Sequence, residues 1–220
     1  MIHAYRAVCH VCRRPQATCY CSLVKPFESR PRFVILCHPR EAKHRLGTVR
    51  MAHLTMTDSL LLEGADFSRH CRVNEILSDD RLFCTVLYPG ANAINLSALA
   101  WEQRTSFVPH GKEWVVFVLD GTWKSVRKMI RSSENLRRLP FVCFDRSQRS
   151  TYRIRKQPRP NFYSTIEGIH YVIDLAGHHG DERVVRSRPH DNLRAIFDRA
   201  IDRQLAYTPL KSDRFIRHLG

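Results

Sequence analysis

Short apolar runs recur along the chain between segments of mixed polarity. Four of them have the length and composition of buried β-strands, at residues 32–37 (RFVILC), 82–88, 113–119 and 140–145. Runs that are apolar throughout are typical of strands buried on both faces, as in a parallel sheet. The pattern therefore predicts an α/β fold in which a mainly parallel sheet is flanked by helices.

Apolar residues also recur at helical spacing between and after these runs. The predicted helical faces are, in chain order, Met51, Leu54 and Leu61; Trp123, Val126 and Ile130; Ile166, Ile169 and Ile173; and the apolar side of residues 190–207. Ligands of parallel sheets bind at the carboxyl ends of the strands. His38-Pro39, Tyr88-Pro89 and Asp120-Gly121 each follow a predicted strand, so we expect the site at these loops.

Composition adds a strong positive charge to this picture. The 220 residues include 36 Lys and Arg against 21 Asp and Glu, a formal net charge of +15 with the histidines neutral. Such an excess favours a polyanionic partner, either nucleic acid or an anionic membrane surface. The longest apolar runs are of strand length, so no membrane-spanning helix is expected.

The N-terminus lacks the long apolar region of a secretory signal, and we expect a cytoplasmic protein whose thiols stay reduced. The eight cysteines are then metal ligands or core residues. No obligate protein partner is indicated.

Four of these cysteines crowd into the segment CHVCRRPQATCYC, as Cys9, Cys12, Cys19 and Cys21. Two close pairs of thiolates can complete a tetrahedral sulfur site for zinc, and four protein ligands would make the site structural. The alternative is four unliganded thiols on an N-terminal arm. Because the composition changes near Pro31, we predict a zinc-binding module at residues 1–30 and a main domain at residues 31–220.

Three further features could carry chemistry. Residues 146–160 are rich in Arg and Lys, and the following Ser164-Thr165-Ile166-Glu167 fits a capping box at a helix N-terminus. Arg50 falls in the first turn of a predicted helix, with Thr48 as its expected cap. A cation is disfavoured there, so Arg50 either has an anionic partner or is a solvated surface residue.

The loop in VLDGTW leaves two readings open. Asp120 could cap the following helix while Trp123 fills the core, or the two could face a substrate. Neither a glycine-rich dinucleotide fingerprint nor a P-loop is present.

Taken in order, these stretches resemble the DTW-domain family. The motifs that carry the resemblance are Cys9, Cys12, Pro15, Cys19 and Cys21; His38-Pro39 with Glu41; Thr48 with Arg50; Tyr88-Pro89; Asp120-Gly121-Thr122-Trp123 with Arg127; Tyr152 to Pro158; and Ser164 to Glu167. The resemblance implies a fold related to the knotted SPOUT methyltransferases. It also implies transfer of the 3-amino-3-carboxypropyl group of S-adenosylmethionine to a uridine ring nitrogen in tRNA, with release of methylthioadenosine.

Roles for individual residues follow from the resemblance and from the chemistry. Asp120 is the candidate general base, with Trp123 beside it either as a catalytic residue or as a structural brace. Residues expected to bind the cofactor are Arg50, Tyr88, Pro89, Thr122, Arg127, Ser164, Thr165 and Glu167. Residues expected to bind RNA are Tyr152, Arg153, Arg155, Lys156 and Arg159.

Three other functions remain open at this point. A SPOUT-like RNA methyltransferase would use the same cofactor, and a related enzyme would modify ribosomal RNA. A non-catalytic zinc and RNA binding module would leave the Asp120 loop without a purpose.

Overall fold

The core of the molecule is a parallel β-sheet. The computed structural model describes residues 7–42, 47–145, 163–176 and 187–207. Six strands form the sheet in the order β2-β1-β5-β3-β6-β4, and every pair of neighbours is parallel. They are β1 (Arg32–Cys37), β2 (Leu60–Glu63), β3 (Leu82–Leu87), β4 (Ile94–Asn95), β5 (Glu113–Asp120) and β6 (Phe141–Cys143). The predicted α/β fold with a parallel sheet is confirmed.

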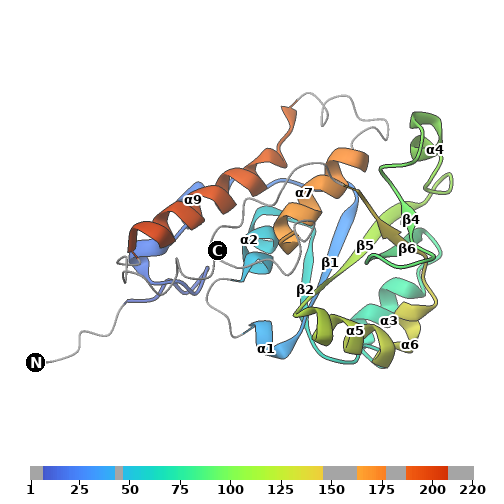
Figure 1. Cartoon of the computed structure of the whole chain (residues 1–220), viewed down its shortest axis with the longest axis horizontal. Helices are drawn as coiled ribbons and strands as arrows, with labels where there is room; N and C mark the ends of the chain where they lie inside the picture. The colour runs from blue at the N-terminus through green and yellow to red at the C-terminus, as the bar shows by residue number, and fades with distance from the viewer. Residues whose placement is uncertain (1–6, 43–46, 146–162, 177–186, 208–220) are drawn as a thin grey trace, which may run out of the picture.

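Helices cover both faces of the sheet (Figure 1). They are α1 (Pro39–Ala42), α2 (Thr48–Thr55), α3 (Cys71–Leu77), α4 (Trp101–Thr105), α5 (Trp123–Ser132), α6 (Glu134–Arg137), α7 (Thr165–Ala176) and α9 (Asp191–Tyr207). Two short 3-10 turns, η1 (Gln16–Thr18) and η2 (Cys21–Leu23), precede the sheet. None of the helices in these parts of the chain has both the length and the apolar character needed to cross a bilayer.

The two apolar layers follow from the alternation of side chains along the inner strands. In β1, Phe33 and Ile35 pack on the side of α2, α7 and α9, whereas Val34 and Leu36 pack on the side of α3, α5 and α6. The inner strands are buried on both faces for this reason, which is why their sequences are apolar throughout.

Two predictions of local structure were wrong. Leu61, assigned to a helical face, lies in β2, where it is paired in register with Ile35 of β1. Thr48 does not cap α2, because it is the first helical residue and the N-cap position is Gly47. Helical spacing was extended to Leu61 although α2 ends at Thr55, whereas the start of α2 differs from the prediction by a single residue.

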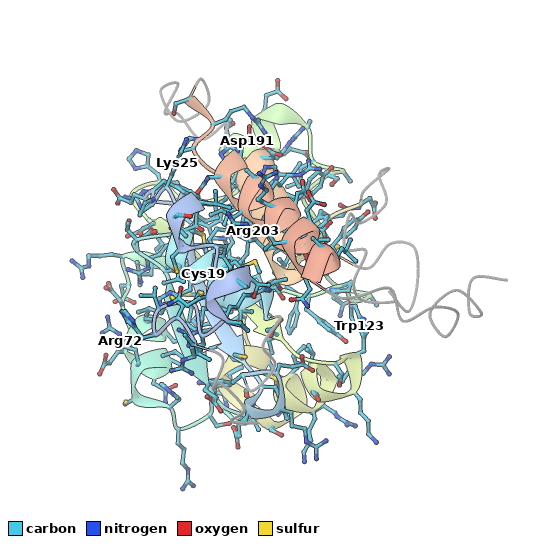
Figure 2. The ribbon with its side chains drawn as sticks, turned by 90° about the vertical axis from the view of Figure 1, so that its left-hand side faces the viewer. Cys19, Lys25, Arg72, Trp123, Asp191 and Arg203 are labelled. Carbon is cyan, nitrogen blue, oxygen red and sulfur yellow. The ribbon has the colours of Figure 1, made fainter. Side chains whose placement is uncertain are left out.

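The cysteine-rich N-terminal segment packs against the last helix, as the positions of Cys19 and Arg203 in Figure 2 show. Arg203 donates a hydrogen bond to the carbonyl of Cys19, and Asn192 bridges Leu23 and Lys25 through its side-chain amide. Tyr20 is buried in the same apolar core as α7 and α9. The predicted module boundary near Pro31 therefore divides segments that share one core, and it stays a prediction.

A cluster of two buried histidines and three more exposed charged side chains joins α7 to the start of α9. His170 and His190 are each 3% exposed, and their Nε2 atoms lie 2.9 Å from Asp191 and Asp174 respectively. Arg188 donates to both carboxylates, at 2.8 Å to Asp174 and 2.9 Å to Asp191. Burial lowers the pKa of His170, so this imidazole is neutral at physiological pH. The cluster holds α7 in place from the end opposite to its first turn.

Candidate active site

Asp120 is the last residue of β5, at the carboxyl edge of the sheet. Its backbone is paired with Cys37 at the end of β1, and its carbonyl accepts a hydrogen bond of 2.9 Å from the N–H of His38. Its side chain is half-buried. Two of the loops expected to form the site, those after β1 and β5, are therefore adjacent.

Both carboxylate oxygens of Asp120 have a donor nearby. The hydroxyl of Thr165 donates to Oδ1 at 2.6 Å, and the thiol of Cys37 lies 3.7 Å from Oδ2. Burial, with the charge of Asp120 adding to it, raises the pKa of Cys37 to about 12, so Cys37 remains a thiol. These two contacts hold the carboxylate in one orientation at the edge of the sheet.

The first turn of α7 brings Thr165 to this position. Preceding it, Ser164 donates to Oε2 of Glu167 from both its backbone N–H and its hydroxyl, each at 2.8 Å. Glu167 is only 4% exposed, and its reach back to Ser164 is the predicted capping interaction. The cap fixes where α7 begins, and the N-terminus of that helix therefore faces Asp120.

A sharp turn after Asp120 leads directly into α5. Thr122 is the N-cap of this helix, since its hydroxyl accepts the N–H of Ser125 at 3.2 Å. The reading of Asp120 as the helix cap is therefore wrong. A Cβ atom at Gly121 would lie 3.2 Å from Ser125 and 3.4 Å from His38, so a side chain there would require these neighbours to shift by a few tenths of an ångström.

Aromatic residues stand beside this turn. The rings of Trp123 and Tyr88 lie 5.9 Å apart, and Tyr88 also contacts Phe141. Trp123 is half-buried, whereas Val126 on the next turn of α5 is buried in the core. The tryptophan thus joins the loops after β3 and β5, which agrees with the bracing role allowed by its sequence.

The other members of the predicted cofactor set include Arg50, Arg127 and Pro89. Arg50, in the first turn of α2, donates to the carbonyl of Val11 at 3.4 Å and so contacts the cysteine segment. Arg127 and Pro89 are exposed. Within the described residues Arg50 thus contacts a backbone carbonyl, and the anionic partner that was one of its two interpretations stays a prediction.

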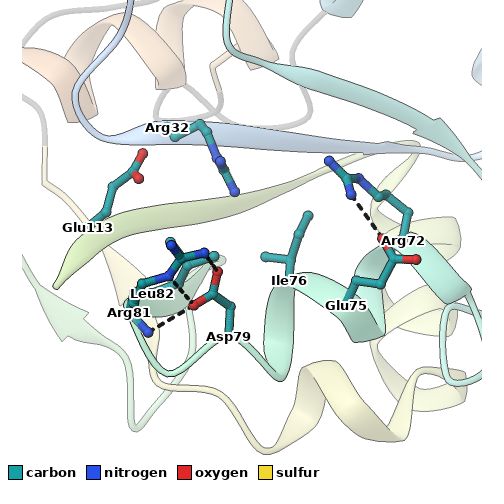
Figure 3. A pocket seen from close by; sticks show the side chains of 8 residues that line it. All are labelled: Arg32, Arg72, Glu75, Ile76, Asp79, Arg81, Leu82 and Glu113. Carbon is teal, nitrogen blue, oxygen red and sulfur yellow. Dashed lines mark hydrogen bonds and ion pairs between the residues drawn. The ribbon is translucent and has the colours of Figure 1, made fainter.

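A surface cavity of about 470 Å³ lies at the opposite end of the sheet (Figure 3). It is lined by the first residues of three strands, among them Arg32 and Glu113. Arg72 pairs with Glu75 at 2.9 Å within it, and Asp79 pairs with Arg81 at 2.8 Å. Because parallel sheets bind ligands at their carboxyl ends, we assign the site to the Asp120 edge.

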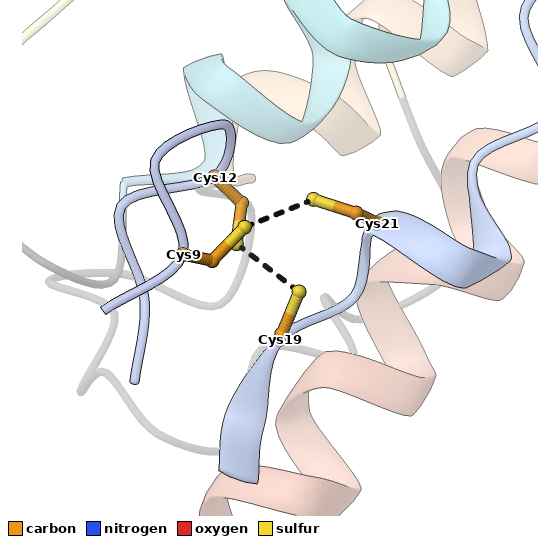
Figure 4. A group of neighbouring side chains, drawn as sticks. All are labelled: Cys9, Cys12, Cys19 and Cys21. Atoms are coloured by element: carbon orange, nitrogen blue, oxygen red, sulfur yellow. Dashed lines mark hydrogen bonds between the residues drawn. The ribbon is translucent and has the colours of Figure 1, made fainter. Parts of the chain in front are cut away.

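The four cysteines of the N-terminal segment come together in space (Figure 4). Their sulfur atoms all lie within 4.8 Å of one another, with 3.7 Å between Cys9 and Cys21 and 3.6 Å between Cys12 and Cys19. Backbone hydrogen bonds from Cys12 and Val11 lower the pKa of Cys9 to about 6, while burial raises that of Cys21. This group could hold one metal ion.

Comparison with known proteins shows to which family the chain belongs. The family model described as the DTW domain matches residues 6–205, a range that contains the cysteine group and the Asp120 edge. The chain belongs to the DTW-domain family. A curated relative, tRNA-uridine aminocarboxypropyltransferase 2 of Drosophila melanogaster, is 28% identical over 224 residues, covering 98% of this chain and 85% of that protein.

A second relative of this DTW-family chain is tRNA-uridine aminocarboxypropyltransferase A of Arabidopsis thaliana. It is 22% identical over 203 residues, which cover 82% of this chain and 76% of that protein. No solved structure matches the chain.

The predicted DTW-family site is thus partly assembled in the structure. Asp120 and Thr165 are in contact, Ser164 and Glu167 support Thr165, and Thr122 begins the adjoining helix. The predicted RNA-binding residues, Tyr152, Arg153, Arg155, Lys156 and Arg159, lie outside the described residues. Sequence reasoning missed Cys37 as a neighbour of the carboxylate, because a cysteine that ends an apolar run looks like a core residue.

Proposed function

We propose that this protein transfers the 3-amino-3-carboxypropyl group of S-adenosylmethionine to a uridine ring nitrogen in tRNA. The observation that carries the proposal is the Asp120 carboxylate, held by Thr165 and Cys37 at the carboxyl edge of a parallel sheet. Membership of the DTW-domain family and the printed names of both relatives support it.

Asp120 acts as the general base in this proposal. The ring N–H of uridine is a weak acid, and the nitrogen must lose its proton to become a nucleophile. A carboxylate that is half-buried and fixed at both oxygens can accept that proton in a defined direction. Thr165 and Cys37 act as positioning residues, since each contacts the base and not the proton that it accepts.

S-Adenosylmethionine, when bound, supplies the transferred group through the carbon next to its sulfonium and leaves as methylthioadenosine. The site fits its anionic end, because the N-terminus of α7 beside Asp120 offers backbone N–H groups and the positive end of a helix dipole. We propose that Ser164, Thr165 and Thr122 hold the cofactor together with Arg50 and Arg127.

The other predicted cofactor residues have structural positions that suit supporting roles. Tyr88 and Pro89 would line the adenosyl side of the site with Trp123, as the contact between the two aromatic rings suggests. Glu167 is buried and bonded to Ser164, so we propose that it acts by holding the first turn of α7.

We further propose that the four cysteines bind a structural zinc ion. A tetrahedron with Zn–S bonds of about 2.3 Å has edges of about 3.8 Å, close to the observed sulfur separations of 3.6 and 3.7 Å. All four donors are sulfur, which suits zinc and leaves no coordination position for substrate. Four reduced cysteines also suit the cytoplasm, where we propose that the protein works.

A relation to the knotted SPOUT methyltransferases is part of the same proposal. The all-parallel sheet with helices on both faces supports it. For tRNA itself, we propose that Arg153, Arg155, Lys156 and Arg159 contact phosphates and that Tyr152 stacks on a base.

The decisive experiment is incubation of the purified protein with S-adenosylmethionine and either unmodified bulk tRNA or ribosomal RNA. Digested nucleosides are then read by mass spectrometry. A uridine heavier by one aminocarboxypropyl group, with methylthioadenosine as by-product, supports the proposal. A methyl adduct with S-adenosylhomocysteine would identify a methyltransferase, modification of ribosomal RNA alone would change the substrate, and the absence of any adduct would indicate a binding module.

A further inference from the structure

Helix α5 carries a row of cations that faces away from the core. Lys124, Arg127, Lys128 and Arg131 are all exposed and follow the spacing i, i+3, i+4, i+7, which places them on one side of the helix. The buried residues Val126 and Met129 lie on the opposite side. We call these four residues the cationic stripe.

The cationic stripe lacks the acidic partners that other helices provide for their arginines. In α3, Arg72 pairs with Glu75 at 2.9 Å, and in α6, Arg138 pairs with Glu134 at 2.6 Å. Helix α5 contains no Asp or Glu, and within the described part of the chain none of the four stripe residues makes an ion pair.

This arrangement is unfavourable for the isolated protein. Lys124 faces Arg127 and Lys128 at one turn's distance, and Arg131 faces the same two residues from the other side, so like charges are neighbours throughout. Lys124 also lies in the first turn, where the helix dipole favours an anion. The four cations do not contribute to core packing that could offset this repulsion, because their side chains are exposed. An anionic partner outside the chain would remove both penalties.

The position of the stripe indicates which partner this is. Helix α5 begins three residues after Asp120, and the stripe runs from Lys124 to Arg131 over about 10.5 Å of helix. A row of separated point charges suits successive phosphate groups along one strand, because such contacts position a nucleic acid without reading its bases.

We propose that Lys124, Lys128 and Arg131 of the cationic stripe bind the phosphate backbone of the substrate RNA next to the target uridine, while Arg127 keeps its proposed role toward the cofactor. This inference rests on the proposed function, since it names the RNA surface of the same site. It adds a second contact surface to the one proposed for residues 146–160, which precede Ser164 in the sequence. The phosphates supply the negative charge that α5 lacks, and the bound strand is aligned with the Asp120 edge.

The test uses the full-length variant Lys124→Gln/Lys128→Gln/Arg131→Gln, which leaves Arg127 unchanged because it belongs to the proposed cofactor set. Binding of unmodified bulk tRNA is measured across a salt series. We expect an affinity roughly tenfold or more weaker near 0.15 M salt, and a salt slope lower by about 2 to 3, since each phosphate contact contributes about 0.7 to 0.9. The temperature of unfolding should stay equal or rise, because repulsion is removed.

A matched control removes the same three charges elsewhere, in Lys25→Gln/Lys112→Gln/Arg199→Gln. These residues are exposed and lie outside α5, and Figure 2 shows Lys25 and Trp123 on opposite sides of the molecule. We expect the control to lose much less affinity than the stripe variant. Equal losses would reduce the effect to net charge and overturn the proposal.

The outcomes separate this inference from the proposed function. If the wild-type protein modifies tRNA but the stripe variant binds tRNA as tightly as the control, the stripe proposal fails alone. If the wild-type protein forms no adduct, the proposed function fails, whatever the binding result. If the stripe variant instead loses binding only to vesicles of anionic phospholipid, the partner is a membrane surface and the RNA assignment is wrong.

Discussion

Replacement of Asp120 by asparagine separates its proposed catalytic role from a structural one. Asparagine keeps the shape of the side chain, and its amide oxygen can still accept the hydroxyl of Thr165, now 2.6 Å from Oδ1. What it cannot do is accept a proton from uridine. General bases contribute roughly 10²- to 10⁴-fold to the rate, so we expect kcat to fall by that factor.

The effect on stability should be small, and the structure shows why. Thr122 caps α5, so no capping interaction is lost. The hydrogen bond from Thr165 changes from a charged to a neutral acceptor, a loss of about 1 kcal/mol that relief of a half-buried charge offsets in part. For a chain of this size, about 1 kcal/mol corresponds to a shift of roughly 2 to 4 °C in the temperature of unfolding.

The assay is single-turnover formation of modified uridine by mass spectrometry, with thermal unfolding measured on the same preparations. Glu63→Gln is a matched control, because Glu63 ends β2 and is paired in register with Cys37, on the other side from Asp120. Full activity in Asp120→Asn would refute the assignment of the base. A temperature of unfolding more than about 10 °C below that of the wild-type protein would show that the carboxylate has a structural role, contrary to the reasoning above.

Three further predictions follow from the contacts of the site and its supports. Thr165→Val should lower kcat/KM roughly 10- to 100-fold by removing the donor to Asp120, and Thr165→Ser should restore it; equal activity of Thr165→Val and wild type would exclude the positioning role. Cys12→Ser should lose bound zinc, measured by atomic absorption, and unfold roughly 10 °C or more lower, whereas Cys71→Ser, at an exposed cysteine outside the group, should do neither. Burial lowers the pKa of His170, so the unfolded chain takes up a proton near pH 6.5 before the folded protein does. The free energy of unfolding should therefore fall as the pH drops below about 6.5. Denaturant titrations at pH 7.5 and 5.5 should show a smaller difference in this free energy for His170→Gln than for the wild-type protein, and an equal difference would contradict the burial argument.

Much of the fold could be predicted because inner parallel strands leave a strong sequence pattern. The runs at 32–37, 82–88 and 113–119 correspond to β1, β3 and β5, which are buried on both faces. The edge strands β2 and β4 were missed, since they are short and only partly buried, and Leu61 of β2 was assigned to a helical face. Residues 60–63 form a strand because they pair with β1. The periodicity of a short segment does not reveal such a pairing with a distant part of the chain.

The candidate site, like the fold, has parts that could be predicted from local sequence and parts that could not. The motif around Asp120 and the capping box at Ser164 could be found from sequence, because each has a local signature. Their contact through Thr165 could not, since it joins residues 45 positions apart along the chain. The neighbours of Arg50 and Cys37 were equally hidden, because the partner of each is set by how segments pack in space.

The packing of the cysteine segment against α9 has a consequence for the order of events during synthesis. Leu23 and Lys25 bond to Asn192, and Cys19 bonds to Arg203, across separations of 167 to 184 residues. A ribosome delivers the first partner of each pair long before the second. The N-terminal cysteines can therefore bind the proposed zinc ion early, but the surface around Tyr20 stays uncovered until α9 has emerged.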